Sequence, residues 1–204
     1  MKRTYIAILA TLSLAASAAL AQTPTNPNGV PVTGASIEQR KDNQQQRIGN
    51  GIENGSLTAK EAGKIESQEK GLNTEERGMR QENGGKLTSA DKTTLNSQQN
   101  KLSNEIYNQK HDAQVQPKAT NEVNARDRAQ QQRIGQGVKS GSLTAGETAK
   151  LENKEANLNK EEHNDRAANG GKLTAGEKTK INRQQNHVSK QIYRNKHNGR
   201  QRKG

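Results

Sequence analysis

Positively charged side chains near the carboxyl end of the chain are the residues whose type and spacing could do chemistry. Residues 178–204 contain nine Lys or Arg residues and no Asp or Glu. At 100° per residue, a helix over 174–197 places six basic side chains on one stripe, opposite an apolar seam of Ile181, Val188 and Ile192. The stripe consists of Lys180, Arg183, His187, Lys190, Arg194 and His197. Such a face predicts electrostatic binding of an anion.

The cationic surface continues past this helix. We expect Lys196, Arg200, Arg202 and Lys203 to extend the anion-binding surface. The expected partner is a polyanion or an acidic protein: extracellular nucleic acid, anionic lipid or lipopolysaccharide, or a teichoic or acidic polysaccharide. Sequence-specific nucleic-acid recognition is not expected, because the chain beyond residue 21 has only two aromatic residues and no DNA-reading motif. A solvated helix face with the cations usual at a helix C-terminus is the alternative explanation.

Enzymatic chemistry is not expected. The chain has no Cys, and its four histidines lack the spacing of a metal site or a catalytic triad: His111, His163, His187 and His197. Paired carboxylates lie beside Lys or Arg on polar segments and are expected at the solvated surface: Glu75 with Glu76, and Glu161 with Glu162. Without an apolar pocket to raise a pKa, such carboxylates are poor general acids. We therefore predict no catalytic residue, no metal ligand and no cofactor.

An internal duplication organises the elements that position these residues. Each position in 36–114 reappears 86 residues later as the same or a similar residue, as in the pairs Ile48/Ile134 and Tyr107/Tyr193. The predicted organisation is a signal peptide (1–21), a linker (22–35), copy one (36–114), a linker (115–121), copy two (122–198) and a basic tail (199–204).

Capping boxes predict where the helices begin. In this motif a Thr hydroxyl accepts the backbone N–H three residues on, and an acidic side chain there reaches back to the Thr amide. Four pairs have this spacing: Thr58/Glu61, Thr88/Asp91, Thr144/Glu147 and Thr174/Glu177. They predict helices over 58–82, 88–111, 144–168 and 174–197. We expect the first helix of copy one to begin at Ile37 and the first helix of copy two to span 122–139.

Short Gly turns between long helices predict antiparallel neighbours, so we expect an all-α fold, a tandem duplication of an antiparallel three-helix bundle. Narrow apolar seams support it, such as Ile65, Leu72 and Met79 at intervals of seven. Core material is scarce, with twelve Ile, Leu, Val or Met in 36–121 and ten in 122–204. Whether the copies pack together is left open by the sequence.

The turns N-G-x-L-T-x-x-E resemble the second half of an EF-hand calcium loop, with Gly55, Leu57 and Glu61 at matching positions. The family's metal binding also needs oxygen ligands early in the loop. Those places hold Asn50, Ile52 and Asn54 in the first turn, Arg80, Glu82 and Gly84 in the second, Gln136, Val138 and Ser140 in the third, and Arg166, Ala168 and Gly170 in the fourth. The resemblance implies degenerate EF-hand-like turns, and calcium binding stays open as an alternative function.

The repeated Leu-Thr starts also resemble those of the periplasmic LTxxQ (Spy-like) stress chaperones, with an acid in place of Gln. The whole chain resembles exported bacterial proteins with G-x-L-T-x-x-E helical repeats. The chaperone resemblance implies a second alternative, a holdase that shields unfolded clients. Lys2 and Arg3, an apolar run and the final Ala-Leu-Ala of residues 19–21 predict export to the periplasm or the extracellular space.

The two copies differ in net charge. Copy one with its linker (36–121) carries 13 Lys and Arg against 12 acids, whereas residues 122–204 carry 18 against 9. Much of this difference lies on the third helix, where Thr94, Ser97, Asn104 and Asn108 correspond to Lys180, Arg183, Lys190 and Arg194. The sequence therefore predicts an exported, non-enzymatic helical protein for binding or structure, which docks an anionic partner through the third helix of copy two.

Overall fold

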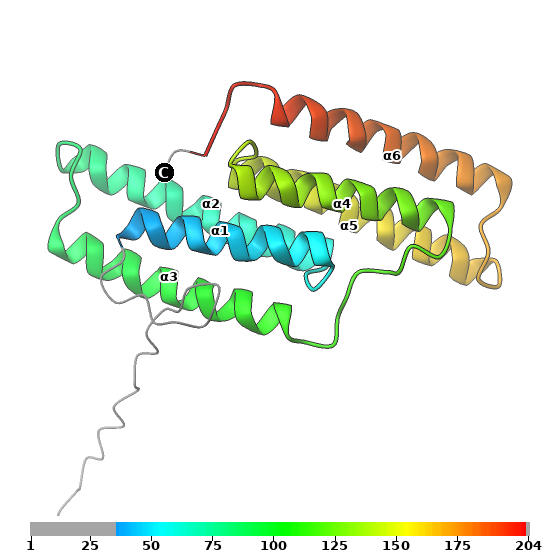
Figure 1. The fold of residues 1–204 in the computed structure, drawn as a ribbon, viewed down its shortest axis with the longest axis horizontal. Coiled ribbons are helices and arrows are strands. Elements are labelled where there is room, and N and C mark those ends of the chain that lie inside the picture. Colours follow the sequence, from blue (N-terminus) through cyan, green and yellow to red (C-terminus); the bar gives the residue numbers. More distant parts are fainter. Residues whose placement is uncertain (1–35, 203–204) are drawn as a thin grey trace, which may run out of the picture.

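The computed structural model describes residues 36–202, which form six α-helices and no strand (Figure 1). Copy one contributes α1 (Ile37–Asn54), α2 (Ala59–Glu82) and α3 (Ser89–Lys110), and copy two contributes α4 (Glu122–Ser140), α5 (Ala145–Ala168) and α6 (Ala175–Lys196). The all-α prediction is confirmed. Across the described residues, none of these helices is long and apolar enough to span a membrane. The predicted signal peptide, the linker 22–35 and the last two residues of the tail lie outside the described residues.

Side-chain caps fix the starts of the helices. Thr58 Oγ1 accepts the Glu61 amide at 3.4 Å, and Glu61 Oε2 accepts the Thr58 amide at 2.8 Å. The same reciprocal pair opens α3, α5 and α6, and Ser36 with Gln39 makes a fifth such cap at α1. Because a cap of this kind contributes about 1 kcal/mol, each short turn defines where the next helix begins and its direction.

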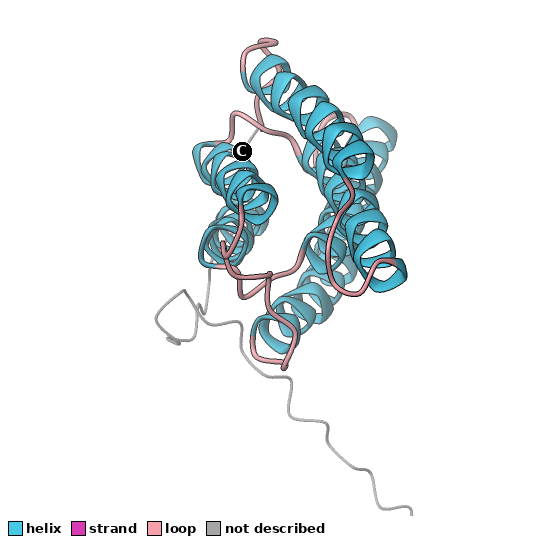
Figure 2. Cartoon of the chain, turned by 90° about the vertical axis from the view of Figure 1, so that its right-hand side faces the viewer, coloured by secondary structure: helices cyan, strands magenta, loops and turns pink. Residues whose placement is uncertain are grey.

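The two copies pack together extensively. The broadest helix contacts run between copies, where α2 lies antiparallel to α5 and α1 lies antiparallel to α4. α3 and α6 occupy opposite outer flanks, each packed on the first two helices of its own copy (Figures 1 and 2). Within a copy the first and second helices pack less closely, and side-chain bonds such as Lys41–Glu76 and Gln45–Glu66 join them across the space between. Neither copy therefore closes a bundle without the other.

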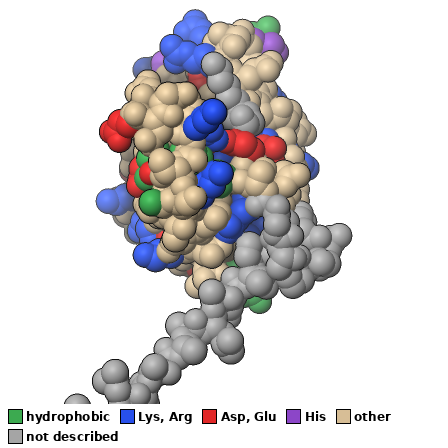
Figure 3. All heavy atoms as spheres, turned by 90° about the vertical axis from the view of Figure 1, so that its left-hand side faces the viewer, with side chains coloured by type: hydrophobic (Ala, Val, Ile, Leu, Met, Phe, Trp, Pro, Cys, Tyr) green, Lys and Arg blue, Asp and Glu red, His purple; other side chains and the backbone are tan. Residues whose placement is uncertain are grey.

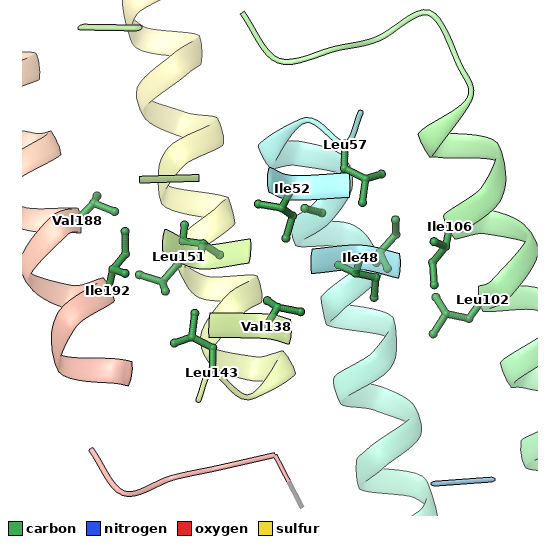
Figure 4. Close-up of a cluster of buried hydrophobic side chains, with 13 residues drawn as sticks. Ile48, Ile52, Leu57, Leu102, Ile106, Val138, Leu143, Leu151, Val188 and Ile192 are labelled. Carbon is green, nitrogen blue, oxygen red and sulfur yellow. The ribbon is translucent and has the colours of Figure 1, made fainter. Parts of the chain in front are cut away.

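One hydrophobic core crosses the boundary between copies (Figure 4). Ile48, Ile52 and Leu57 of copy one pack in the same cluster as their counterparts 86 residues later. Those counterparts are Ile134, Val138 and Leu143, and all six side chains are fully buried. With so few aliphatic residues per copy, pooling both sets is the way this chain buries a core of useful size.

The predicted seam of α2 is only partly correct. Ile65 is fully buried, whereas Leu72 and Met79 are half-buried. The other buried positions of α2 are small residues near its start (Ala59, Ala62, Gly63) or glutamates, because the helix packs on α3 with one face and on α5 with another. A single apolar stripe could not cover both faces.

Two glycines set the closest approach of α1 and α4. A Cβ on Gly49 would lie 2.9 Å from the Gly135 carbonyl oxygen, and a Cβ on Gly135 would lie 2.8 Å from the Gly49 carbonyl oxygen. The contact is reciprocal, as expected for an approximate two-fold axis between the copies. A Cβ added to Gly71, in the interior of α2, would meet no other atom within 4 Å.

These glycines make opposite predictions. Gly135→Ala is expected to lower the free energy of unfolding by about 1–3 kcal/mol, because the new methyl group must push the α1 backbone away. Gly71→Ala is the matched control and should raise that free energy by about 1 kcal/mol through helix propensity alone. Urea denaturation followed by circular dichroism measures both, and a Gly135→Ala protein as stable as Gly71→Ala would contradict the close crossing.

The segments after α3 and α6 belong to the repeat. The Gln116 amide donates to the Gly55 carbonyl at 3.0 Å, and the Arg202 amide donates to the Gly141 carbonyl at 2.9 Å. Gln116 and Arg202 are themselves 86 residues apart. The predicted linker and basic tail therefore return to dock on the first turn of their own copies, and Arg202 lies between the copies rather than on the outer surface.

Candidate functional site

The basic stripe of α6 is on the surface of the molecule. Ile181, Val188 and Ile192 are buried against α4 and α5, as the seam predicted. The opposite face carries six exposed basic side chains, which we call the basic face: Lys180, Arg183, His187, Lys190, Arg194 and His197. Since α6 lies at the outer edge of the fold, no other described helix covers this face (Figure 1).

Buried amides hold α6 in register, a feature that the sequence analysis missed. Gln130 Nε2 on α4 donates to the Gln185 carbonyl at 2.7 Å, and Gln185 Nε2 donates to the Val123 carbonyl at 2.9 Å. Gln44 and Gln99 make the equivalent bonds in copy one. These bonds crosslink each outer helix to the first helix of its copy, so the basic face is mounted on a fixed support.

Most cations of the basic face have no acidic partner. Lys180 is the exception, since its Nζ lies 2.5 Å from Glu161 Oε1, and this contact raises the pKa of Lys180. Arg183, Lys190 and Arg194 make no ion pair within residues 36–202. Their charges are therefore available to a ligand.

The two histidines have local partners. His187 Nε2 lies 2.8 Å from Gln191 Nε2. The His197 ring stacks on Tyr193, with 4.3 Å between ring centroids, and its Nδ1 lies 2.7 Å from the Tyr193 carbonyl oxygen. These contacts fix the two rings on the edge of the basic face.

Four further residues were predicted to extend this surface, and the structure places them differently. Arg200 is exposed. Lys196 is half-buried, with its Nζ 3.3 Å from the Arg133 carbonyl oxygen. Arg202 does not extend the face, because it donates to the Val138 carbonyl at 2.9 Å and pairs with Asp42 at 3.1 Å. Lys203 lies outside the described residues.

Lys154 of α5 lies at the border of the basic face and was not predicted as part of this surface. Its Nζ donates to Gln191 Oε1 at 2.5 Å, at the border between α5 and α6. The corresponding position in copy one is Gln68, which donates to Glu105. Both changes from copy one to copy two make this border more positive: Gln68 becomes Lys154 and Glu105 becomes Gln191. A comparison of the two copies could therefore have identified Lys154.

Carboxyl groups are buried where α2, α4 and α5 pack. Five of the buried ones have a raised pKa: Glu66, Glu69, Asp127, Glu152 and Glu155. Burial raises the pKa of Glu66 and Glu155 to about 8, that of Glu69 to about 7 and that of Asp127 to about 6. Burial, together with the nearby Glu155 and Asp127, raises the pKa of Glu152 well above its usual range. These side chains are therefore largely uncharged in mildly acidic solution.

The prediction that all four paired carboxylates are solvated is wrong for one member of each pair. Glu76 is 5% exposed and Glu162 is 7% exposed. Glu76 accepts from Lys41 at 3.0 Å and Arg80 at 2.7 Å, and Glu162 accepts from Arg166 at 2.8 Å. The inward turn of these acids follows from the packing of α2 and α5 on two sides.

The acids that resemble calcium-closing glutamates serve as caps. Glu61 Oε2 is bonded to the Thr58 amide, and Glu147 Oε2 is bonded to the Thr144 amide and hydroxyl. Asn198 donates to the other oxygen of Glu147 at 2.7 Å. Among residues 36–202, no group of three or more His, Cys, Asp or Glu is placed to hold a metal ion.

Comparison of the chain with protein-family models, with curated proteins and with solved structures found no match. A function must therefore be argued from the chemistry of the surface itself. The basic face of α6 is the most prominent feature of that surface, because it combines exposure, one sign of charge and a rigid support.

Proposed function

We propose that this chain is an exported, non-enzymatic binding protein that docks a polyanion on the basic face of α6. One observation carries the proposal: three of its exposed arginine and lysine side chains have no acidic partner among the described residues. An unpaired cluster of like charge raises the free energy of the isolated protein and is relieved by an anionic partner.

The duplication shows that folding does not require these charges. Thr94, Ser97, Asn104 and Asn108 occupy the same exposed positions on α3, where the helix packs on equivalent neighbours. Their counterparts on α6 are Lys180, Arg183, Lys190 and Arg194. The same scaffold therefore exists with a neutral outer face and with a cationic one, and the cations support a role outside folding.

The length of the basic face indicates the kind of partner. Lys180 and His197 are seventeen residues apart, which corresponds to roughly 25 Å along a helix. A row of charges of this length matches an extended polymer or a charged surface better than a small molecule. Tyr193 is the only aromatic side chain on this helix, so base stacking contributes little and binding should depend on charge rather than on sequence.

A charge-swap variant tests the proposal. Lys180→Thr, Arg183→Ser, Lys190→Asn and Arg194→Asn together convert the basic face to the residues of copy one. We expect affinity for heparin, used as a sulfated polymer probe, to fall by about tenfold or more at low salt. Fluorescence anisotropy with labelled heparin, measured from about 50 to about 200 mM salt, should also show that the affinity of the variant falls less steeply with salt than that of the parent.

The matched control removes the same net charge elsewhere. Lys60, Lys86, Lys92 and Lys101 are exposed in copy one and can be changed together to Gln. This variant should retain most of the affinity. Equal losses in both variants would mean that only net charge matters, and unchanged binding in the charge-swap variant would refute docking on α6.

A further inference from the structure

A cleft between the two copies lies away from the basic face. Its walls are the start of α1, residues 70–80 of α2, the first turn of α5 and residues 199–202, and its volume is about 1020 Å³. Figure 3 looks onto this end of the molecule, where Lys and Arg side chains lie around a smaller number of acidic ones. Both copies contribute to the walls, so the cleft exists only in the assembled fold.

Cations dominate the lining. Six Lys or Arg residues line the cleft against two glutamates, which gives a net charge of +4. The two glutamates, Glu38 and Glu76, are both occupied by Lys41 and Arg80, at distances of 2.7–3.1 Å. The charges of these two cations and two glutamates therefore balance each other, and the other lining cations account for the net positive charge.

Three lining cations make no ion pair among residues 36–202, although one of them, Arg200, lies close enough to Glu147 to lower the pKa of that carboxyl. They are Lys70, Arg77 and Arg200, and all three are exposed at the mouth of the cleft. Lys70 lies beside Gly146, where a Cβ would be 3.4 Å from Lys70 Cδ. Two guanidinium groups and an ammonium group from α2 and the C-terminal segment thus border one solvent-filled space.

The first turn of α5 adds a positive helix end to the same space. Ala145 and Gly146 line the cleft, and amides at this position in a helix have no intrahelical acceptor. Oxyanions are favoured at such helix ends by the exposed N–H groups and the helix dipole. Glu147 opposes this effect with one charge, although Thr144 and Asn198 already bond its carboxylate.

The duplication supplies a comparison for this cleft. Lys70 corresponds to Ala156, Arg77 to His163 and Arg200 to Gln114. Lys41 and Arg202 correspond to Asp127 and Gln116, so five of the six cations are replaced and only Arg80, matched by Arg166, is kept. Because α2 and α5 have the same lengths and caps, helix formation does not explain these cations.

We propose that this cleft binds a compact, multiply charged phosphoryl oxyanion, held by Lys70, Arg77 and Arg200 and by the first turn of α5. Guanidinium forks fit tetrahedral oxyanions through paired hydrogen bonds, and the lysine adds a mobile point charge. The lining contains no aromatic side chain and few apolar ones, so a hydrophobic ligand has nothing to bury against. The site is independent of docking on α6 and would remain if that proposal failed.

Tripolyphosphate is a suitable probe, and isothermal titration calorimetry of the whole chain measures its affinity. The variant carries the corresponding copy-two or linker residues: Lys70→Ala, Arg77→His and Arg200→Gln. We expect at least about tenfold weaker binding, because the variant replaces two guanidinium groups and one ammonium group that would donate charged hydrogen bonds to the ligand. The α6 charge-swap variant is the control and should bind within about threefold of the parent.

Two results would overturn the proposal: unchanged affinity in the cleft variant, or equal losses in the cleft and α6 variants. Amide chemical shifts give a second readout, because tripolyphosphate should move the Ala145 and Gly146 signals of the parent but not those of the variant. Vesicles containing phosphatidic acid distinguish the source of the phosphoryl group. Vesicle binding that requires the three cations would assign a lipid headgroup, whereas binding of tripolyphosphate alone would assign a soluble phosphate.

Discussion

The protein is expected to be more stable at pH 5.5 than at pH 8, with a higher urea midpoint at the lower pH. Five carboxyl groups on α2, α4 and α5 are buried with a raised pKa, and burial raises the pKa of Glu66 from its ordinary value of 4.5 to about 8. A group whose pKa is raised on folding binds more protons in the folded state. Its contribution is complete below pH 4.5 and is lost as the pH rises through the folded value.

The groups that face these acids strengthen the effect in copy two. Glu69 of copy one lies near Lys41 and Arg202, and both cations lower its pKa, against the larger effect of burial. Glu155 instead faces Asp127, which raises its pKa further, although Arg133 opposes this. Each titrating carboxyl adds a slope of about 1.4 kcal/mol per pH unit, so stability should fall by several kcal/mol in all between about pH 5 and pH 8.

Glu66→Gln with Glu152→Gln provides the test. Gln45 and Gln131 donate to these carboxylates at 3.2 and 2.9 Å, and a Gln oxygen can accept the same bonds. The double variant should be more stable than the parent at pH 8 and should lose less stability between pH 5.5 and 8. Glu82→Gln, at an exposed site, should leave the pH dependence unchanged. A parent protein most stable above pH 8 would contradict this account.

Below about pH 4.5, further acidification is expected to lower the stability of the fold. Burial is the largest single influence on the pKa of Glu76 and Glu147 and raises it, but ion pairs and hydrogen bonds together outweigh burial and lower both pKa values. Groups of this kind lose their contribution as the pH falls below about 4.5. Maximum stability is therefore expected in mildly acidic solution rather than at the isoelectric point.

Local features of the fold could be predicted from the sequence because they depend on neighbouring residues. A Thr with an acid three residues later is enough to begin a helix, and the helix boundaries were predicted within one residue. The basic face followed from helical periodicity, since Val188 and Lys190 lie on opposite faces of one helix. Both inferences need only the spacing of side chains along a single element.

Features that depend on pairing between copies were not predicted. A carboxylate such as Glu155 is polar by type, and only the approach of α5 to α2 and α4 buries it. Arg202 appears free at the end of the chain, but the docking of the segment behind it places it between the copies. Each helix can present a second buried face only when its partner is known, and the sequence left that partner open.

Separating the copies is expected to abolish the fold. The helices of copy one, within residues 36–121, bury much of their apolar surface against α4 and α5, and the cluster around Ile48 includes side chains from both copies. A monomeric fragment of these residues would leave Ile52 and Ile65 in water and should lose most of its helical signal. Circular dichroism melts at low concentration test this, and a cooperative melt of a fragment shown to be monomeric by sedimentation would contradict it.

The two fragments should differ in their ability to replace the missing half. The reciprocal contact of Gly49 with Gly135 means that a second molecule of copy one can occupy the place of copy two. In such a dimer Lys41 faces Glu69 in both halves, whereas a dimer of residues 122–204 brings Asp127 against Glu155 twice. Copy one should therefore recover helicity with increasing concentration at neutral pH, and copy two should do so only when acid neutralises those carboxyl groups.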